Sequence, residues 1–173
     1  MTGATETAAL SHLPVRTARL DLHVFTRGDV TAMLEGRRLP RWVEGYPRED
    51  DVDVARHVAS LPAPGPQDVP WLPRHIVVRE IGLAVGSVGF FGPPGPDASV
   101  EIGYGLVEGA RHQGYASEAV AGLVAAAQAA GIRLVVAHTL PDNVPSQAVL
   151  LRNRFLPTGR NEDGEPRFER RLS

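Results

Sequence analysis

The chain has 173 residues, of which 43% are hydrophobic and 22% are charged, as in a soluble globular protein with one sizeable core. Its formal net charge of −2 gives no general attraction to nucleic acid or to an acidic membrane, so we expect neither as a partner. Because cysteine is absent, disulfides, thiolate nucleophiles and cysteine metal sites are excluded.

The N-terminal residues lack the features of a targeting segment. Residues 1–14 are small and polar, without the basic start and long apolar run of a signal peptide. No stretch of the sequence approaches the roughly 20 apolar residues of a membrane span. We therefore expect a flexible N-terminus over 1–14, a single domain over 15–173 and a cytoplasmic protein.

The first half of the domain reads as a strand, two helices and a strand pair. Apolar residues alternate in the first strand and recur at helical spacing in the two helices. A proline-rich segment, 62–73, is not expected to form regular structure. The predicted elements are a strand over 16–25, helices over 26–38 and 48–61, and strands over 75–80 and 83–91 that turn near Gly82.

The second half alternates strands and helices before a terminal hairpin. The first of its helices is apolar almost all round, which predicts packing on a sheet, and Gly131 suits its C-terminal cap. The predicted elements are a strand over 99–106, a helix over 116–130, a strand over 132–140, a helix over 144–154, and a hairpin of 155–159 with 166–173. The order β-α-α-β-β-β-α-β-α-β-β predicts an α/β domain with a mixed, mostly antiparallel sheet and one strand–helix–strand crossover.

The segment "ARHQGYASEA", residues 110–119, stands where a strand passes into a helix. The first N–H groups of a helix are unpaired and attract anions, and a glycine lets the anion approach the backbone. Arg111 adds a fork of donors suited to phosphate. The segment is either a phosphate cradle or an ordinary turn. It is not a Walker loop, because the chain has no lysine, and "GYGLVEG" at 103–109 is one residue too long for a dinucleotide fingerprint.

The pattern Arg111-x-x-Gly114-x-Ala116 resembles the acyl-CoA loop of the GNAT superfamily of N-acetyltransferases. "VEIGYGL" before it, "SEA" after it and "DNVPSQAVLLRNRF" at 142–155 resemble the branch that includes the ribosomal-protein N-terminal (alanine) acetyltransferases. The resemblance covers roughly residues 16 to 172. There are two departures: Arg154 stands where a glycine is usual, and the helix over 143–154 lacks a tyrosine that many members use as an acid.

The resemblance implies acetyl-CoA as acyl donor and a primary amine that attacks the thioester directly, with no metal. The pyrophosphate would lie on the loop N–H groups and the pantetheine along the preceding strand, where two strands part. A strand N–H near Leu106 would polarise the carbonyl. The implied donor contacts are Leu106, Val107, Arg111, His112, Gln113, Gly114, Tyr115, Ala116, Ser117 and Asn143.

The implied catalytic residues are Glu101, Ser146 and Asn143. Glu101 matches a base position of some members; otherwise it faces solvent or pairs with an arginine. Ser146 would hydrogen-bond the leaving sulfur, and Asn143 would contact pantetheine or a water, cap its helix, or do both. Tyr104 and Tyr115 are rival acids, although Tyr104 falls on the strand face opposite Glu101, which favours the core.

The remaining candidates are aromatic and histidine residues. His138 stands near a strand end beside the predicted site. It either lies in the core or at the rim of the site, or takes part in catalysis. Trp42, Tyr46 and Trp71 either wall an acceptor pocket or seal the core. The six histidines show no ligand spacing, so we expect no metal.

Two other functions remain open at this point: an inactive acyl-CoA-binding sensor of the same fold, and another nucleotide-binding α/β protein. The acceptor is expected to be a small molecule or a protein N-terminus, and a homodimer is possible.

Overall fold

The structure is a computed structural model that describes residues 13–173. The segment predicted to be flexible, 1–14, lies outside the described residues apart from residues 13 and 14.

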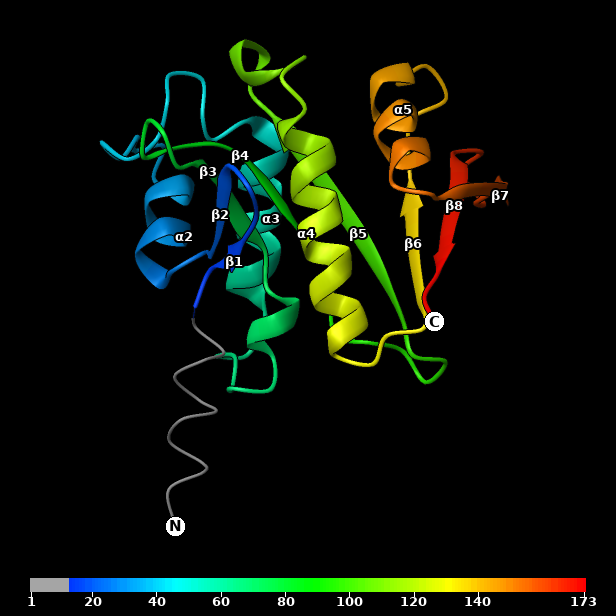
Figure 1. Ribbon diagram of the computed structural model, residues 1–173. Coiled ribbons are helices and arrows are strands. Elements are labelled where there is room, and N and C mark those ends of the chain that lie inside the picture. The colour runs from blue at the N-terminus through cyan, green and yellow to red at the C-terminus, as the bar shows by residue number, and fades with distance from the viewer. Residues whose placement is uncertain (1–12) are drawn as a thin grey trace.

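An eight-stranded sheet forms the centre of the molecule, in the order β1-β2-β3-β4-β5-β6-β8-β7 (Figure 1). All neighbouring strands are antiparallel except β5 and β6, which are parallel. The strands are β1 (Val15–Arg16), β2 (Leu20–Val24), β3 (Arg74–Val78), β4 (Leu83–Phe90), β5 (Ser99–Leu106), β6 (Leu134–His138), β7 (Leu156–Arg160) and β8 (Pro166–Arg171).

Helices cover the two faces of the sheet unequally. Helices α4 (Tyr115–Ala129) and α5 (Val144–Arg152) lie on one face, and α3 (Glu49–Ser60), which packs with α2 (Arg27–Leu34), lies on the other (Figure 1). Helix α4 connects the parallel strands β5 and β6 and buries its apolar side on the sheet. Among residues 13–173, no helix covers the face of β5, β6 and β8 that is opposite α4 and α5 (Figure 1).

Strand β5 changes partner halfway along its length. Its first part, Ser99–Glu101, pairs with β6, and its second part, Ile102–Leu106, pairs with β4. Beyond Glu101 and its partner Val136 the two parallel strands diverge. The sheet therefore has a gap beside the second part of β5, and the chain passes from there toward the start of α4.

The predicted fold class and element order are confirmed. The turn at Gly82 has φ +67°, and Gly131 follows the last residues of α4 with φ +84°, as expected for the two glycines. The structure adds β1 and two short 3-10 helices, η1 (Val69–Trp71) and η2 (Glu108–Ala110). Helix η1 lies within the proline-rich segment expected to be irregular, because a proline in its first turn has no N–H that the helix would need.

Candidate functional site

The start of α4 presents free backbone donors. Gly114 is the N-cap residue, with φ +81° and no side-chain cap, and its carbonyl accepts the first helical hydrogen bond from Glu118. The N–H groups of Tyr115, Ala116 and Ser117 precede that bond, so the helix itself leaves them unpaired. This end of α4 also carries the partial positive charge of the helix dipole. The geometry suits an anion, and the phosphate cradle stays a prediction.

Arg19 lies over this helix start, although it is far away in the sequence. Its Nη1 donates to the carbonyl of Gln113 at 2.9 Å, and its Nε donates to Glu118 at 2.7 Å. Its guanidinium lies 4.8 Å from the ring centre of Tyr115, and a Cβ on Gly114 would lie 3.2 Å from its Nη2. Arg19 therefore adds a cation to the cradle that the motif at 111–116 did not reveal.

Glu118 anchors this arrangement from the first turn of α4. Its Oε1 accepts hydrogen bonds from the Thr17 hydroxyl at 2.5 Å and the Arg19 backbone N–H at 2.6 Å. Burial by itself would raise the pKa of Glu118, but the hydrogen bonds from Thr17 and Arg19 outweigh it and lower the pKa. The carboxylate thus stays ionised and holds Arg19 in place.

The remaining loop residues are exposed. Arg111 donates from Nε to the carbonyl of Leu106 at 3.4 Å, and Gln113 donates to the carbonyl of Gly109 at 3.4 Å. His112 has a left-handed backbone, with φ +62°. These side chains surround the helix start on its solvent side.

The backbone of β5 points alternately toward β4 and toward the gap. The Val107 N–H donates to Val85 in β4, and the Phe91 N–H donates to Glu101. In an antiparallel ladder, the residues between these pairs direct their N–H groups to the other side. The Leu106 N–H therefore points into the gap, whereas the Val107 N–H is already occupied by Val85.

Tyr104 spans the gap from β5 to the start of α5. Its hydroxyl lies 2.9 Å from both the Ser146 hydroxyl and the Ser146 carbonyl oxygen. Burial raises the pKa of Tyr104 to about 12, although the hydrogen bond with Ser146 acts in the opposite direction. Asn143 caps α5, since its Oδ1 accepts the Ser146 N–H at 3.2 Å. Its predicted capping role is confirmed; its predicted contact with pantetheine stays a prediction.

Glu101 lies on the opposite face of β5, in contact with His138. The His138 Nδ1 and the Glu101 Oε1 are 2.7 Å apart. No arginine side chain in the described chain lies within salt-bridge distance of Glu101, so of its alternative roles the arginine pair is not formed. The glycines that follow on this face, Gly103 and Gly105, leave room that the Phe91 ring and the Arg48 guanidinium fill.

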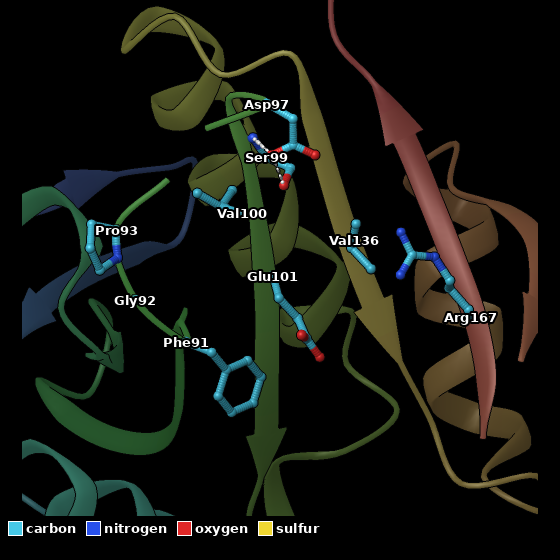
Figure 2. A pocket seen from close by; sticks show the side chains of 9 residues that line it. All are labelled: Phe91, Gly92, Pro93, Asp97, Ser99, Val100, Glu101, Val136 and Arg167. Carbon is cyan, nitrogen blue, oxygen red and sulfur yellow. Dashed lines mark hydrogen bonds between the residues drawn. The ribbon is translucent and has the colours of Figure 1, made fainter. Parts of the chain in front are cut away.

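A hollow of about 430 Å³ opens beside Glu101 (Figure 2). We call it the Glu101 hollow. Its floor is formed by β5 and β6, and Phe91 and Arg167 lie on its two sides (Figure 2). It is lined by Phe91, Gly92, Pro93, Asp97, Ser99, Val100, Glu101, Val136 and Arg167.

The aromatic candidates lie away from this hollow. Trp42 and Tyr46 are each 1% exposed and contact each other edge to face. The Tyr46 hydroxyl is 2.7 Å from the Nδ1 of His75, which lies in β3 and is itself buried. Of the two roles considered for Trp42 and Tyr46, sealing the core fits this position. Trp71 is half buried, with its ring 5.7 Å from that of Phe90.

Sequence reasoning missed Arg19, Arg48 and Phe91 and gave His138 no definite role. No local spacing links Arg19 to Gln113 and Glu118, or Arg48 to Gly105. The pairing of β5 with β6, which brings Glu101 and His138 together, is a long-range feature. Within residues 13–173, no helix is both long and apolar enough to cross a membrane. That same range has no cluster of three or more His, Asp or Glu side chains arranged for a metal ion.

Comparisons with known proteins agree with the motif. The family model described as "Acetyltransferase (GNAT) domain" matches residues 19–156. The sequence has no significant match among curated proteins.

Solved structures of similar fold include two ribosomal-protein acetyltransferases and a RimJ protein. RimL, the ribosomal L7/L12 alpha-N-protein acetyltransferase in complex with coenzyme A, is 20% identical, with a TM-score of 0.64 over 92% of this chain and 97% of that one. Ribosomal-protein-S5-alanine acetyltransferase from Vibrio fischeri is 15% identical, with a TM-score of 0.61 over 91% and 96%. RimJ from Mycobacterium smegmatis, in complex with CoA-disulfide, is 21% identical, with a TM-score of 0.60 over 92% and 84%. At these identities the likeness establishes the fold.

Proposed function

The chain belongs to the GNAT acetyltransferase family, and from this premise we propose that it transfers an acetyl group from acetyl-CoA to a primary amine. The acceptor is the amine of a small molecule or of a protein N-terminus, and it attacks the thioester directly. One observation carries the proposal: the divergence of β5 from β6, which opens a gap between the glycine-capped start of α4 and the Glu101 hollow.

The start of α4 fits the diphosphate of acetyl-CoA. The free N–H groups of Tyr115, Ala116 and Ser117 would bind it, with Arg111 and Arg19 as neighbouring cations. A side chain on Gly114 would occupy space beside Arg19, which supports a close approach of the ligand to this backbone. The pantetheine would follow Leu106, Val107 and Asn143 along the gap. Acetyl-CoA supplies the activated thioester, and the chain supplies placement, polarisation and proton transfer.

Placement contributes most to the rate, because holding two reactants in line is worth about 7–11 kcal/mol. The Leu106 N–H is the donor that would stabilise the developing oxyanion. One such donor contributes about 3 kcal/mol in enzymes that use an oxyanion hole. Val107 contributes through its backbone position only, since its N–H is bound to Val85.

Proton transfer divides between the two faces of β5. Glu101, in the hollow, accepts a proton from the incoming ammonium, directly or through a water. Ser146 and Tyr104, on the other face, donate to the leaving thiolate. A tyrosine whose pKa is about 12 remains protonated at neutral pH and serves as a donor of this kind. This pair takes the place of the tyrosine that α5 lacks.

Release of CoA thiol in the presence of a panel of amines tests the proposal. Because the chain has no cysteine, a thiol reagent reports CoA without background from the protein. The panel contains small amines, polyamines, amino acids and peptides with free N-termini, and Glu101→Gln is the control. We expect amine-dependent thiol release that the variant loses by about 100-fold or more.

Other outcomes separate the alternatives. Micromolar binding of acetyl-CoA by calorimetry, without thiol release for any amine, would indicate an acyl-CoA-binding sensor. Competition by ADP-ribose-type ligands, with no contribution from pantetheine, would indicate another nucleotide-binding protein. Absence of acetyl-CoA binding would overturn the proposal.

A further inference from the structure

We propose that His138 is a positioning residue for Glu101: its Nδ1–H holds one carboxylate oxygen, so that the other is presented to the acceptor amine. This inference rests on the proposed function and adds a residue to it. The two side chains come from adjacent parallel strands, with Nδ1 and Oε1 2.7 Å apart. Val136 is the register partner of Glu101, and His138 is two residues further along the same face of β6.

The side chains of His138 and Glu101 differ in solvent exposure, and each has a separate role. The side chain of His138 is 15% exposed and that of Glu101 is 40% exposed. The carboxylate therefore reaches the Glu101 hollow while the imidazole stays beneath it. A long, half-exposed glutamate side chain has several rotamers, and a directed hydrogen bond selects among them. The hydrogen bond with His138 thus restricts Glu101 to fewer side-chain conformations than it would have on its own.

The other ring nitrogen determines the protonation state. The His138 Nε2 is buried and has no hydrogen-bond partner in the described part of the chain. A doubly protonated ring would place a buried N–H donor there without an acceptor. We therefore assign a neutral ring with its proton on Nδ1, where Glu101 accepts it. The pair then carries one negative charge, located on the carboxylate.

The neighbouring charges leave this arrangement intact. Arg167 stands opposite His138 in β8, and Glu169 stands opposite Val136. Arg167 donates from Nε and Nη2 to Glu169 at 3.0 and 2.9 Å. The positive charge of Arg167 is therefore paired with the Glu169 carboxylate. Asp97 accepts from the Ser99 hydroxyl at 2.6 Å, at the far end of the hollow.

The chemistry balances with the acceptor as an ammonium ion. The Glu101 Oε2 takes one proton, and the freed amine nitrogen forms a bond to the thioester carbonyl carbon. The C–S bond breaks, the sulfur takes a proton from the Ser146 and Tyr104 pair, and the acylated nitrogen loses its second proton to solvent. Solvent then returns a proton to the Ser146 and Tyr104 pair and takes up the proton that Glu101 holds. The His138 proton stays on Nδ1 throughout, because Nε2 is buried and has no partner in the described chain from which it could take a replacement proton.

The test compares His138→Leu with His138→Asn, using an amine that the wild-type protein acetylates. Leucine removes the donor, whereas the asparagine side chain places an N–H near the position of Nδ1. We expect His138→Leu to lower kcat by about 10- to 100-fold, and His138→Asn to recover most of it. The KM for acetyl-CoA and its calorimetric affinity stay unchanged in both variants. His23→Leu, at an exposed histidine on β2, is the control and keeps full activity.

The His138→Leu substitution, made in a Glu101→Gln protein, distinguishes a positioning role from a general structural role. If His138 acts through Glu101, then His138→Leu has no further effect on kcat in a Glu101→Gln protein. An equal fall in both backgrounds, or full activity of His138→Leu, overturns the inference. Lack of rescue by asparagine, with thermal stability retained, would show instead that the imidazole itself carries the proton. If the wild-type protein acetylates no amine, the proposed function fails first and this inference fails with it.

Discussion

The hydroxyl of Tyr104 lies 2.9 Å from the hydroxyl of Ser146, which connects the middle of β5 to the first turn of α5 across the gap in the sheet. Period-two counting placed Tyr104 on the face opposite Glu101, as the structure has it, and favoured the core. The ring is half buried, but the hydroxyl reaches the site. The two faces of one strand therefore carry the proposed proton acceptor and the proposed proton donor.

Replacing Tyr104 by phenylalanine tests the donor. Tyr104→Phe removes one hydroxyl and keeps the ring that packs against the core. We expect kcat to fall by about 10- to 100-fold with little change in the KM for acetyl-CoA, because the donor acts on the leaving thiolate. Steady-state kinetics by thiol release measures both constants. Tyr115→Phe is the matched control, and an equal loss in that variant would argue against a specific role for Tyr104.

The same tyrosine predicts a loss of stability in alkali. In the folded protein the pKa of Tyr104 is about 12, above the value near 10 of an unfolded chain. The stabilising contribution of the Tyr104 side chain is complete below pH 10 and is lost as pH rises toward 12. In that window this tyrosine ionises only in the unfolded chain. Urea unfolding at pH 9, 10 and 11 measures it. The free energy of unfolding should fall less steeply in Tyr104→Phe, and parallel slopes for the two proteins would contradict the assignment.

Local pattern predicted most of the fold but few of the contacts in the site. Alternation and helical spacing place the strands and helices because each depends on neighbours within a few residues. The glycine at the start of α4 was also found locally, since a glycine where a strand passes into a helix is a local pattern. Register between distant strands is not encoded in this way, so the contact of Glu101 with His138 required the structure.

Buried polar groups were the hardest to predict. Asp29, Tyr46 and His75 form a connected buried group, with the His75 Nε2 3.2 Å from an Asp29 oxygen. Burial by itself would raise the pKa of Asp29, but the contacts with His75 and Thr26 outweigh it and hold the pKa well below its usual range. From the sequence, Tyr46 was expected either to wall an acceptor pocket or to seal the core, and Asp29 and His75 had no predicted role. Only the fold shows that they lie together in the core.

We expect an added side chain to weaken acetyl-CoA binding at the start of α4 but not at its end. Gly114→Ala adds a Cβ at φ +81°, 3.2 Å from Arg19, whereas Gly131→Ala adds one at φ +84° into open space. Both changes strain the backbone by about 1–2 kcal/mol. We expect only Gly114→Ala to weaken the binding of acetyl-CoA, by 10-fold or more, as measured by calorimetry. Equal affinities for the two variants would show that the start of α4 does not contact the ligand.

The end of α5 predicts a stabilising change. Arg154 follows the C-cap residue Asn153 with φ +61°, a left-handed conformation that costs a side-chain-bearing residue about 1 kcal/mol. Its N–H donates to Leu151 and the Phe155 N–H donates to Leu150, so the turn is fixed by backbone hydrogen bonds. This is the position at which the resemblance led us to expect glycine.

We therefore expect Arg154→Gly to raise the free energy of unfolding by about 1 kcal/mol. The charge of Arg154 affects the free energy of unfolding separately, because burial and the nearby Arg154 both lower the pKa of Arg170. Arg154→Ala removes the charge but keeps a Cβ in the strained conformation, so the difference between the glycine and alanine variants isolates the backbone term. Chemical denaturation of the three proteins measures it. If the alanine and glycine variants are equally stable, the left-handed conformation of residue 154 carries no strain.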